Sequence, residues 1–145
     1  MILTDKSILG PWIAHRCNAV FTPDNSSTIG WVQEDGRITA GVWYEDYNQV
    51  SVTTHIAVEE PLTRRYLNVI FDYPFEQLGV KNIIAPVISD NDLSIDFVKK
   101  LGFEEKARLL DVFPSGDLLF FVMTKDKCKY IGERYGKRRV STTTT

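Results

Sequence analysis

Apolar and polar residues alternate along two stretches in the first half of the chain, residues 37–44 and 51–58. Alternation with a period of two residues predicts β-strands that bury one face. A third strand is predicted over residues 29–33, because Asp35 and Gly36 follow it and Asp-Gly is a strong signal for a tight hairpin. The three segments together predict an antiparallel meander.

The apolar spacing then changes to that of an amphipathic helix over residues 62–78. Gly79 can end this helix, and Pro74, which has no backbone N–H, is expected to kink its last turn. An apolar strand is predicted over residues 82–89. Because a strand–helix–strand connection within one sheet is right-handed, residues 51–58 and 82–89 are predicted to be parallel neighbours.

A second helix is predicted over residues 91–101, because its start and stop signals are both present. Asp90 or Asn91 can cap the N-terminus, and Gly102 can adopt the positive φ that often ends a helix. One apolar stripe is expected on this helix, formed by Leu93, Phe97 and Leu101.

Two more strands are predicted over residues 107–113 and 118–124, joined by a Pro-Ser-Gly-Asp turn. Residues 1–28 are predicted to hold only a short helix that begins at Pro11. The order of elements predicts an α/β fold with a mixed, mostly antiparallel sheet and flanking helices.

A chain of 145 residues with 43% apolar and 25% charged residues fits one globular domain, which we expect over residues 1–128. Residues 129–145 are expected to be a basic, disordered tail. The net charge of −2 gives no general attraction to nucleic acid or anionic lipid, and no apolar run approaches the ~20 residues of a membrane span. Two cysteines and two histidines without CxxC spacing predict neither a disulfide scaffold nor a metal site, so we expect a cytoplasmic protein.

Residues 91–103 resemble the C-terminal signature of the GNAT acetyltransferase superfamily. Asn91, Ser94 and the run Lys100-Leu101-Gly102-Phe103 carry the resemblance. With the predicted order of elements, the resemblance extends over residues 29–124. Residues 71–81 also resemble the branch that contains the ribosomal-protein N-terminal acetyltransferases, and small proteins of this kind occur in phage and prophage genomes.

The resemblance implies transfer of an acyl group, most simply acetyl from acetyl-CoA, to an amine on an unknown small molecule or protein. In the family, the pantetheine arm of acyl-CoA enters a gap between two central parallel strands that splay apart. Pro86 fits such a splay, because it lacks the N–H that a continuous ladder requires. A bulge or a short edge strand is the alternative explanation of Pro86.

The candidate cofactor-binding residues that the resemblance implies are Ala57, Val58, Arg64, Arg65, Tyr66, Asn91 and Phe97. The family's pyrophosphate loop is rich in glycine, whereas residues 59–66 contain none. We therefore expect one of the two arginines to supply charge in place of close backbone contact. An ordinary solvated helix start is the alternative.

His55 is the best-placed general base, because it lies on the strand expected to line the cofactor and imidazole exchanges protons near neutral pH. Glu59, at the end of that strand, is the second candidate, and a structural role is the alternative for His55. The family's usual proton-donating Tyr is replaced by Val98, so Ser94 or a water is expected to protonate the thiolate.

Two alternative functions are also compatible with the sequence. A catalytically degenerate member of the family would act as a binding or structural factor in a phage-related setting, and a nucleic-acid-binding module would use the basic tail. The N-terminal region before Ile29 is short for the family. We therefore consider a homodimer, in which a second subunit supplies part of the acceptor site.

Overall fold

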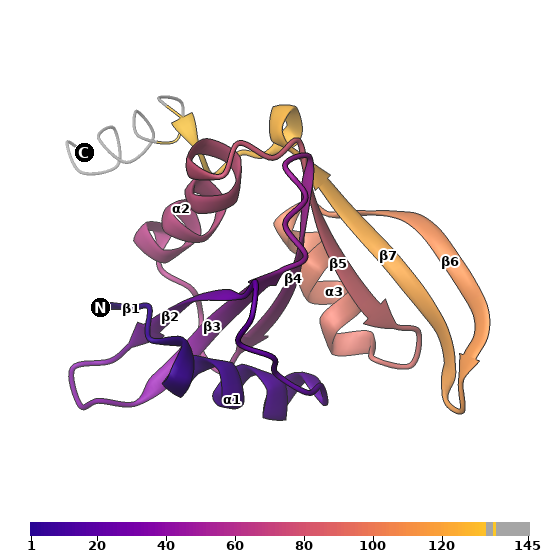
Figure 1. The fold of residues 1–145 in the computed structure, drawn as a ribbon, viewed down its shortest axis with the longest axis horizontal. Coiled ribbons are helices and arrows are strands. Elements are labelled where there is room, and N and C mark those ends of the chain that lie inside the picture. The colour runs from indigo at the N-terminus through magenta and orange to yellow at the C-terminus, as the bar shows by residue number, and fades with distance from the viewer. Residues whose placement is uncertain (133–134, 136–145) are drawn as a thin grey trace.

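The computed structural model describes residues 1–132 and residue 135. One mixed sheet has the strand order β1-β2-β3-β4-β5-β7-β6, and every neighbouring pair is antiparallel except β4 and β5 (Figure 1). The strands are β1 (Ile2–Leu3), β2 (Ser27–Val32), β3 (Ile38–Glu45), β4 (Ser51–Val58), β5 (Asn82–Ile88), β6 (Glu104–Phe113) and β7 (Gly116–Thr124). The helices are α1 (Lys6–Cys17), α2 (Arg64–Asp72) and α3 (Asp92–Leu101). The predicted α/β fold class and the parallel central pair are confirmed.

The helices divide between the two faces of the sheet. On one face, Leu9 and Ile13 of α1 pack in a cluster with Trp43 and Ala57 of the sheet. On the other face, residues of α2 and α3 share the larger core cluster with apolar side chains of β3, β4, β5 and β7. The alternation of side chains along β4 explains this division, because successive side chains of a strand point to opposite faces of the sheet.

The parallel pairing of β4 and β5 is short, and it ends next to Pro86. It covers only Ser51–Thr53 against Asn82–Ile84, and beyond this point the two strands diverge (Figure 1). The N–H of Asn82 donates to the carbonyl of Val50, so every second residue of β5, including Pro86, turns its backbone toward β4. Since Pro86 has no N–H, the next bond of the ladder cannot form. The splayed pair that Pro86 suggested is therefore present.

Helix α1 is longer than predicted and contains Pro11 in its interior. Asp5 caps it, since its carboxylate accepts from the backbone N–H of Ser7 at 3.0 Å. The helix survives the proline because it docks very closely on the sheet. A Cβ at Gly30 of β2 would lie 2.4 Å from the Leu9 side chain, and one at Gly41 of β3 would lie 2.7 Å from that of Ile13. The predicted helix start at Pro11 is therefore wrong.

At Pro74 the α-helical geometry of α2 changes to that of a π-helical turn, and the predicted kink stays a prediction. Helix α2 runs into a π-helical turn, Tyr73–Gln77, in which the N–H of Leu78 donates to the carbonyl of Tyr73. Pro74 cannot donate to the carbonyl of Ile70, which instead accepts the buried hydroxyl of Tyr44 at 2.5 Å. The polar group that the proline leaves free is thus satisfied from the sheet.

Helix α3 has the caps that its sequence predicts. Asn91 caps the N-terminus, with its Oδ1 accepting the N–H of Ser94 at 3.2 Å, and Gly102 ends the helix with φ of 114°. The predicted apolar stripe is only partly correct, because Leu93 is 85% exposed and Val98 is buried in its place. Val98, rather than Leu93, therefore belongs to the apolar side of α3 that faces the core.

Ordered packing extends past Cys128, the expected end of the domain. Tyr130 stacks on Phe71 at 4.8 Å between ring centroids, and its hydroxyl donates to the carbonyl of Leu101. Tyr135 is also buried and donates to the carbonyl of Arg64 at 3.0 Å. The disordered tail was expected over residues 129–145, which includes these two tyrosines; residues 133–134 and 136–145 of it lie outside the described part of the chain.

Candidate active site

The splay of β4 and β5 opens a cleft of about 130 Å³ between the two strands. Thr54, His55 and Ile56 of β4 form one wall, and residues 85–88 of β5 form the opposite wall. The N-terminal half of α3 closes one side, and the last residues of α1 close the other. Four elements that are distant in the sequence thus meet at the point where the sheet opens.

One edge of β4 faces this cleft, because β5 pairs with β4 only as far as Thr53. The N–H of Glu59 donates to Thr39 of the neighbouring segment at 2.8 Å, so every second residue of β4, including Ala57, bonds toward β3. Ile56 and Val58 therefore turn their backbone N–H and C=O groups toward this open edge, although Ile56 lines the cleft and Val58 does not. The side chain of Ala57 is buried against α1. Of the two predicted backbone contacts, the geometry favours Val58 over Ala57.

His55 lies in the cleft and is held by two neighbours on β3. Its Nε2 lies 2.9 Å from Oε1 of Glu45, and its ring lies 4.4 Å from the ring of Trp43. The side chain is only 17% exposed, so the imidazole has little freedom to move. A buried, oriented imidazole beside an open cleft is a suitable general base.

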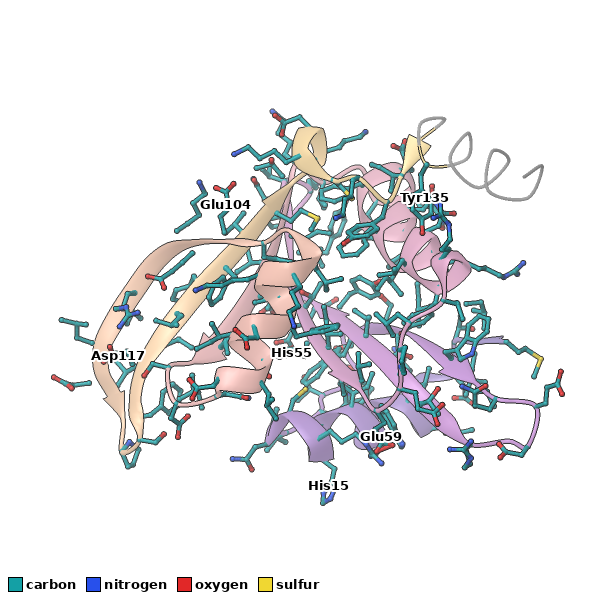
Figure 2. The ribbon with its side chains drawn as sticks, turned by 180° about the vertical axis from the view of Figure 1, so that it is seen from behind. His15, His55, Glu59, Glu104, Asp117 and Tyr135 are labelled. Carbon is teal, nitrogen blue, oxygen red and sulfur yellow. The ribbon has the colours of Figure 1, made fainter. Side chains whose placement is uncertain are left out.

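Glu59, the second candidate base, and His15, the only other histidine of the chain, are less suited. Oε2 of Glu59 accepts from Nε of Arg16 at 3.3 Å, which commits this carboxylate to an ion pair. Glu59 does not line the cleft. His15 is exposed on the outer side of α1, away from His55 (Figure 2).

Three predicted site residues lie together at the start of α3, facing β4 and β5. Asn91, Ser94 and Phe97 all line the cleft. Asn91 is also the N-cap of α3, and its role as a cofactor-binding residue stays a prediction. Val98 lines the cleft as well, at the position where the family resemblance expects a tyrosine, and Ser94 is the residue of α3 that brings a hydroxyl to the cleft.

At the start of α2, the predicted pyrophosphate site, the backbone N–H groups of Arg64 and Arg65 have no hydrogen-bond partner among the described residues, and one arginine is available. Thr63 caps the helix and takes up the N–H of Tyr66 at 3.1 Å. The guanidinium of Arg64 lies over the Tyr135 ring at 4.8 Å. Arg65 is exposed and forms no ion pair with any of the residues that the structure describes.

Tyr66 is not available to a ligand, contrary to the prediction. Its side chain is 0% exposed, and its hydroxyl donates to the carbonyl of Ile29 at 2.7 Å. Burial raises the pKa of this phenol far above its ordinary value. Tyr66 therefore anchors α2 to the edge of β2. The sequence of the loop could not show that α2 is rotated so that this side chain points into the core.

The two acidic residues before α2, which would oppose a phosphate, are each engaged elsewhere. Glu59 pairs with Arg16, and Glu60 accepts from Gln33 at 3.0 Å and lies 3.4 Å from Arg37. These contacts offset the negative charge of the loop. Because both carboxylates are paired, this glycine-free loop repels an anion less than its sequence suggested.

Sequence reasoning missed the contribution of α1 to the cleft. Arg16 and Cys17, in the last turn of that helix, both line it. The thiol of Cys17 donates to the carbonyl of Ile56 at 3.8 Å, and burial raises its pKa to about 11. The thiol is thus protonated at neutral pH and is a poor nucleophile. No local sequence signal marks these residues, since only the docking of α1 brings them to β4.

Within residues 1–132 and 135, no group of three or more potential metal ligands is present. No helix in that part of the chain has the length and apolar character needed to cross a membrane.

Comparisons with known proteins agree with this geometry. The chain matches the family model of the acetyltransferase (GNAT) domain over residues 11–116. A spermidine/spermine N-acetyltransferase from Vibrio cholerae, solved with manganese ions, is 14% identical with a TM-score of 0.70, covering 90% of this chain and 94% of that one. A spermidine N-acetyltransferase from Vibrio cholerae in complex with CoA and spermine is 18% identical with a TM-score of 0.63, covering 75% and 70%. No curated protein sequence matches the chain.

Proposed function

The chain belongs to the acetyltransferase (GNAT) domain family, and we propose that it binds acetyl-CoA in the cleft between β4 and β5 and presents the acetyl group to an amine held near His55. Family membership makes the protein an acetyl-CoA-dependent N-acetyltransferase. The observation that carries the proposed site is the convergence of His55, Asn91 and Ser94 at the splay.

The cleft offers suitable partners along the length of an acyl-CoA. The backbone of Ile56 and Val58 along the open edge of β4 supplies donors and acceptors for the amides of the pantetheine arm. The start of α2 and the guanidinium of Arg65 suit the pyrophosphate, because free N–H groups and the helix dipole favour an anion there. Asn91 and Ser94 line the cleft itself and are proposed to lie beside the thioester.

Acetyl-CoA supplies an acetyl group that passes to the amine nitrogen as the thioester C–S bond breaks. His55 is proposed to take the proton that the acceptor ammonium must lose before its nitrogen can attack. The Ser94 hydroxyl, or a water beside it, is proposed to protonate the departing thiolate. Positioning of the two reactants in one cleft supplies much of the remaining rate enhancement.

Two acceptor classes are worth testing first. Polyamines are suggested by the fold neighbours, which are named as spermidine or spermine acetyltransferases. Peptide N-termini are suggested by the likeness of residues 71–81 to the ribosomal-protein branch. We also propose a cytoplasmic location, and we keep the homodimer as a proposal because the region before Ile29 is short for the family.

The test is release of free CoA thiol from acetyl-CoA in the presence of spermine or of peptides with free N-termini. His55→Ala is expected to lower kcat by about 10²–10⁴-fold, the usual contribution of a general base. His15→Ala, the only other histidine change in the chain, is the matched control and should leave kcat unchanged. A fully active His55→Ala enzyme would remove His55 from the mechanism.

A further inference from the structure

We propose that Glu45 is a positioning residue for the reaction, which fixes the tautomer and orientation of His55. This inference rests on the proposed role of His55 as general base. Neither the pattern of the chain nor the family resemblance singles out Glu45, which reads as the first residue of a turn.

The β3–β4 hairpin brings the two side chains together on one face of the sheet. His55 lies opposite Trp43, and Glu45 lies opposite Thr53, so Glu45 is the diagonal neighbour of His55. Diagonal pairs across antiparallel strands lie within reach of long side chains. Here Oε1 of Glu45 lies 2.9 Å from Nε2 of His55, and the two side chains are only 22% and 17% exposed.

The contact determines where the imidazole carries its proton. An ionised carboxylate can only accept hydrogen bonds, so Nε2 of His55 must donate to Glu45. The neutral ring then holds its proton on Nε2 and leaves the lone pair on Nδ1, which has no hydrogen-bond partner among residues 1–132 and 135. Nδ1 is thus the atom that takes the proton of the acceptor amine, and the Glu45 carboxylate stabilises the imidazolium that results.

Trp43 packs against the imidazole of His55 from a second direction. Trp43 is itself held by hydrogen bonds that lead to the loop before β2. The Trp43 indole N–H donates to Oγ of Ser26 at 3.0 Å, and that hydroxyl donates to the carbonyl of Thr22 at 2.6 Å. Because Trp43 is anchored in this way and lies 4.4 Å from the His55 ring, the imidazole can neither tilt nor rotate away from Glu45 without disturbing the core.

Few ionisable groups surround His55 in this part of the structure. Glu45 faces it from β3, and Arg16 and Cys17 line the same cleft from α1. The guanidinium of Arg16 is paired with Glu59 and lies over the Trp12 ring. The α3 residues that line the cleft, Asn91, Ser94, Phe97 and Val98, carry no charge. Glu45 is therefore the anion in direct contact with the imidazole.

The experiment is a double-mutant cycle on the full-length enzyme, with thiol release from acetyl-CoA as the readout and Glu45→Gln and His55→Ala as the variants. Glu45→Gln is expected to lower kcat by about 10–100-fold, the usual cost of losing an outer-shell orienting carboxylate, with KM for acetyl-CoA unchanged. In the His55→Ala background, the same change should lower kcat less than about threefold, because it acts through His55. Glu45→Asp should recover part of the loss. The matched control is Asp46→Asn, which removes the adjacent exposed charge, keeps the positive φ of 56° and should not alter kcat.

The conservative variant gives a readout that a purely structural role would not change. If the carboxylate orients His55, Glu45→Asp should recover more of kcat than Glu45→Gln, which keeps the shape of the side chain but cannot act only as an acceptor. An undiminished kcat in His55→Ala would overturn the proposed general base itself. A reduced kcat in His55→Ala, combined with an unchanged kcat in Glu45→Gln or with equal losses in both backgrounds, would overturn only the role of Glu45.

Discussion

The hydroxyl of Thr54 donates to the carbonyl of Ile84 at 3.2 Å, at the point where β4 and β5 stop pairing. Thr54 is 3% exposed, so this bond is made away from bulk solvent. It joins the two walls of the cleft at its narrow end, one step before Pro86 ends the ladder. The side chain of Thr54 thus hydrogen-bonds β4 to β5 at the point where backbone hydrogen bonds between the two strands end.

Thr54→Val is expected to destabilise the fold by about 1–2 kcal/mol. The substitution keeps the shape of the side chain and leaves the carbonyl of Ile84 without its donor, which has a cost of this size for a buried group. Urea unfolding measures the change. Thr53→Val is the control, because Thr53 lies on the opposite face and its hydroxyl makes no hydrogen bond within the described residues. If both variants were equally stable, the hydrogen bond of Thr54 would contribute nothing to the stability of the fold at the narrow end of the cleft.

Arg65→Ala is expected to weaken acetyl-CoA binding by about 10–100-fold, because a charge-assisted bond to phosphate contributes roughly 1.5–3 kcal/mol. Arg64→Ala is the matched control and should change the Kd little, since the guanidinium of Arg64 already lies over Tyr135. Titration calorimetry gives both constants. Identical Kd values for both variants and the parent would place the pyrophosphate elsewhere.

Acetyl-CoA is expected to protect Cys17 from alkylation and to leave Cys128 unprotected. Burial raises the pKa of both thiols to about 11, so both react slowly at neutral pH, and labelling should quicken about tenfold per pH unit as pH rises toward 11. Only Cys17 lines the cleft, whereas Cys128 lies in a separate hollow near Lys81. Mass spectrometry of the labelled peptides follows the two sites in one sample. Equal labelling rates for Cys17 with and without saturating acetyl-CoA would contradict occupancy of the cleft.

Gly102→Val is expected to destabilise the fold by about 1–3 kcal/mol, and Lys99→Ala by less than about 0.5 kcal/mol. Gly102 ends α3 at φ of 114°, where a β-branched residue is strained, and its N–H donates to Lys99 at 3.0 Å. The side chain of Lys99 is exposed. Thermal unfolding compares the two variants, and equal melting temperatures would show that the cap geometry is not required.

The strand pattern predicted the sheet well because it depends on burial of one face, which is visible in the order of residues. Residues 51–58 were predicted with the bounds that β4 has, and Pro86 was linked correctly to the splay. The extent of α1 was not predictable in the same way. Gly10 and Pro11 disfavour a helix locally, and the helix is held by contacts with Gly30 and Gly41, which are far away in the sequence.

The same distinction explains which candidate residues the structure brings together. His55, Asn91, Ser94 and Phe97 lie on elements whose faces follow from local periodicity or caps, and the structure brings all four to one cleft. Glu45 and Arg16 became visible only through tertiary structure, because one depends on the hairpin register and the other on the docking of α1. Tyr66 was misplaced because its orientation depends on how α2 is rotated against β2.

A crystal structure of the protein with acetyl-CoA tests the central claim most directly. We predict electron density for the pantetheine arm between β4 and β5, with its amides bonded to the backbone of Ile56 and Val58, its thioester near Ser94 and its pyrophosphate at the start of α2 beside Arg65. Binding at any other surface, or an empty cleft at a ligand concentration that saturates the enzyme in solution, would contradict the account.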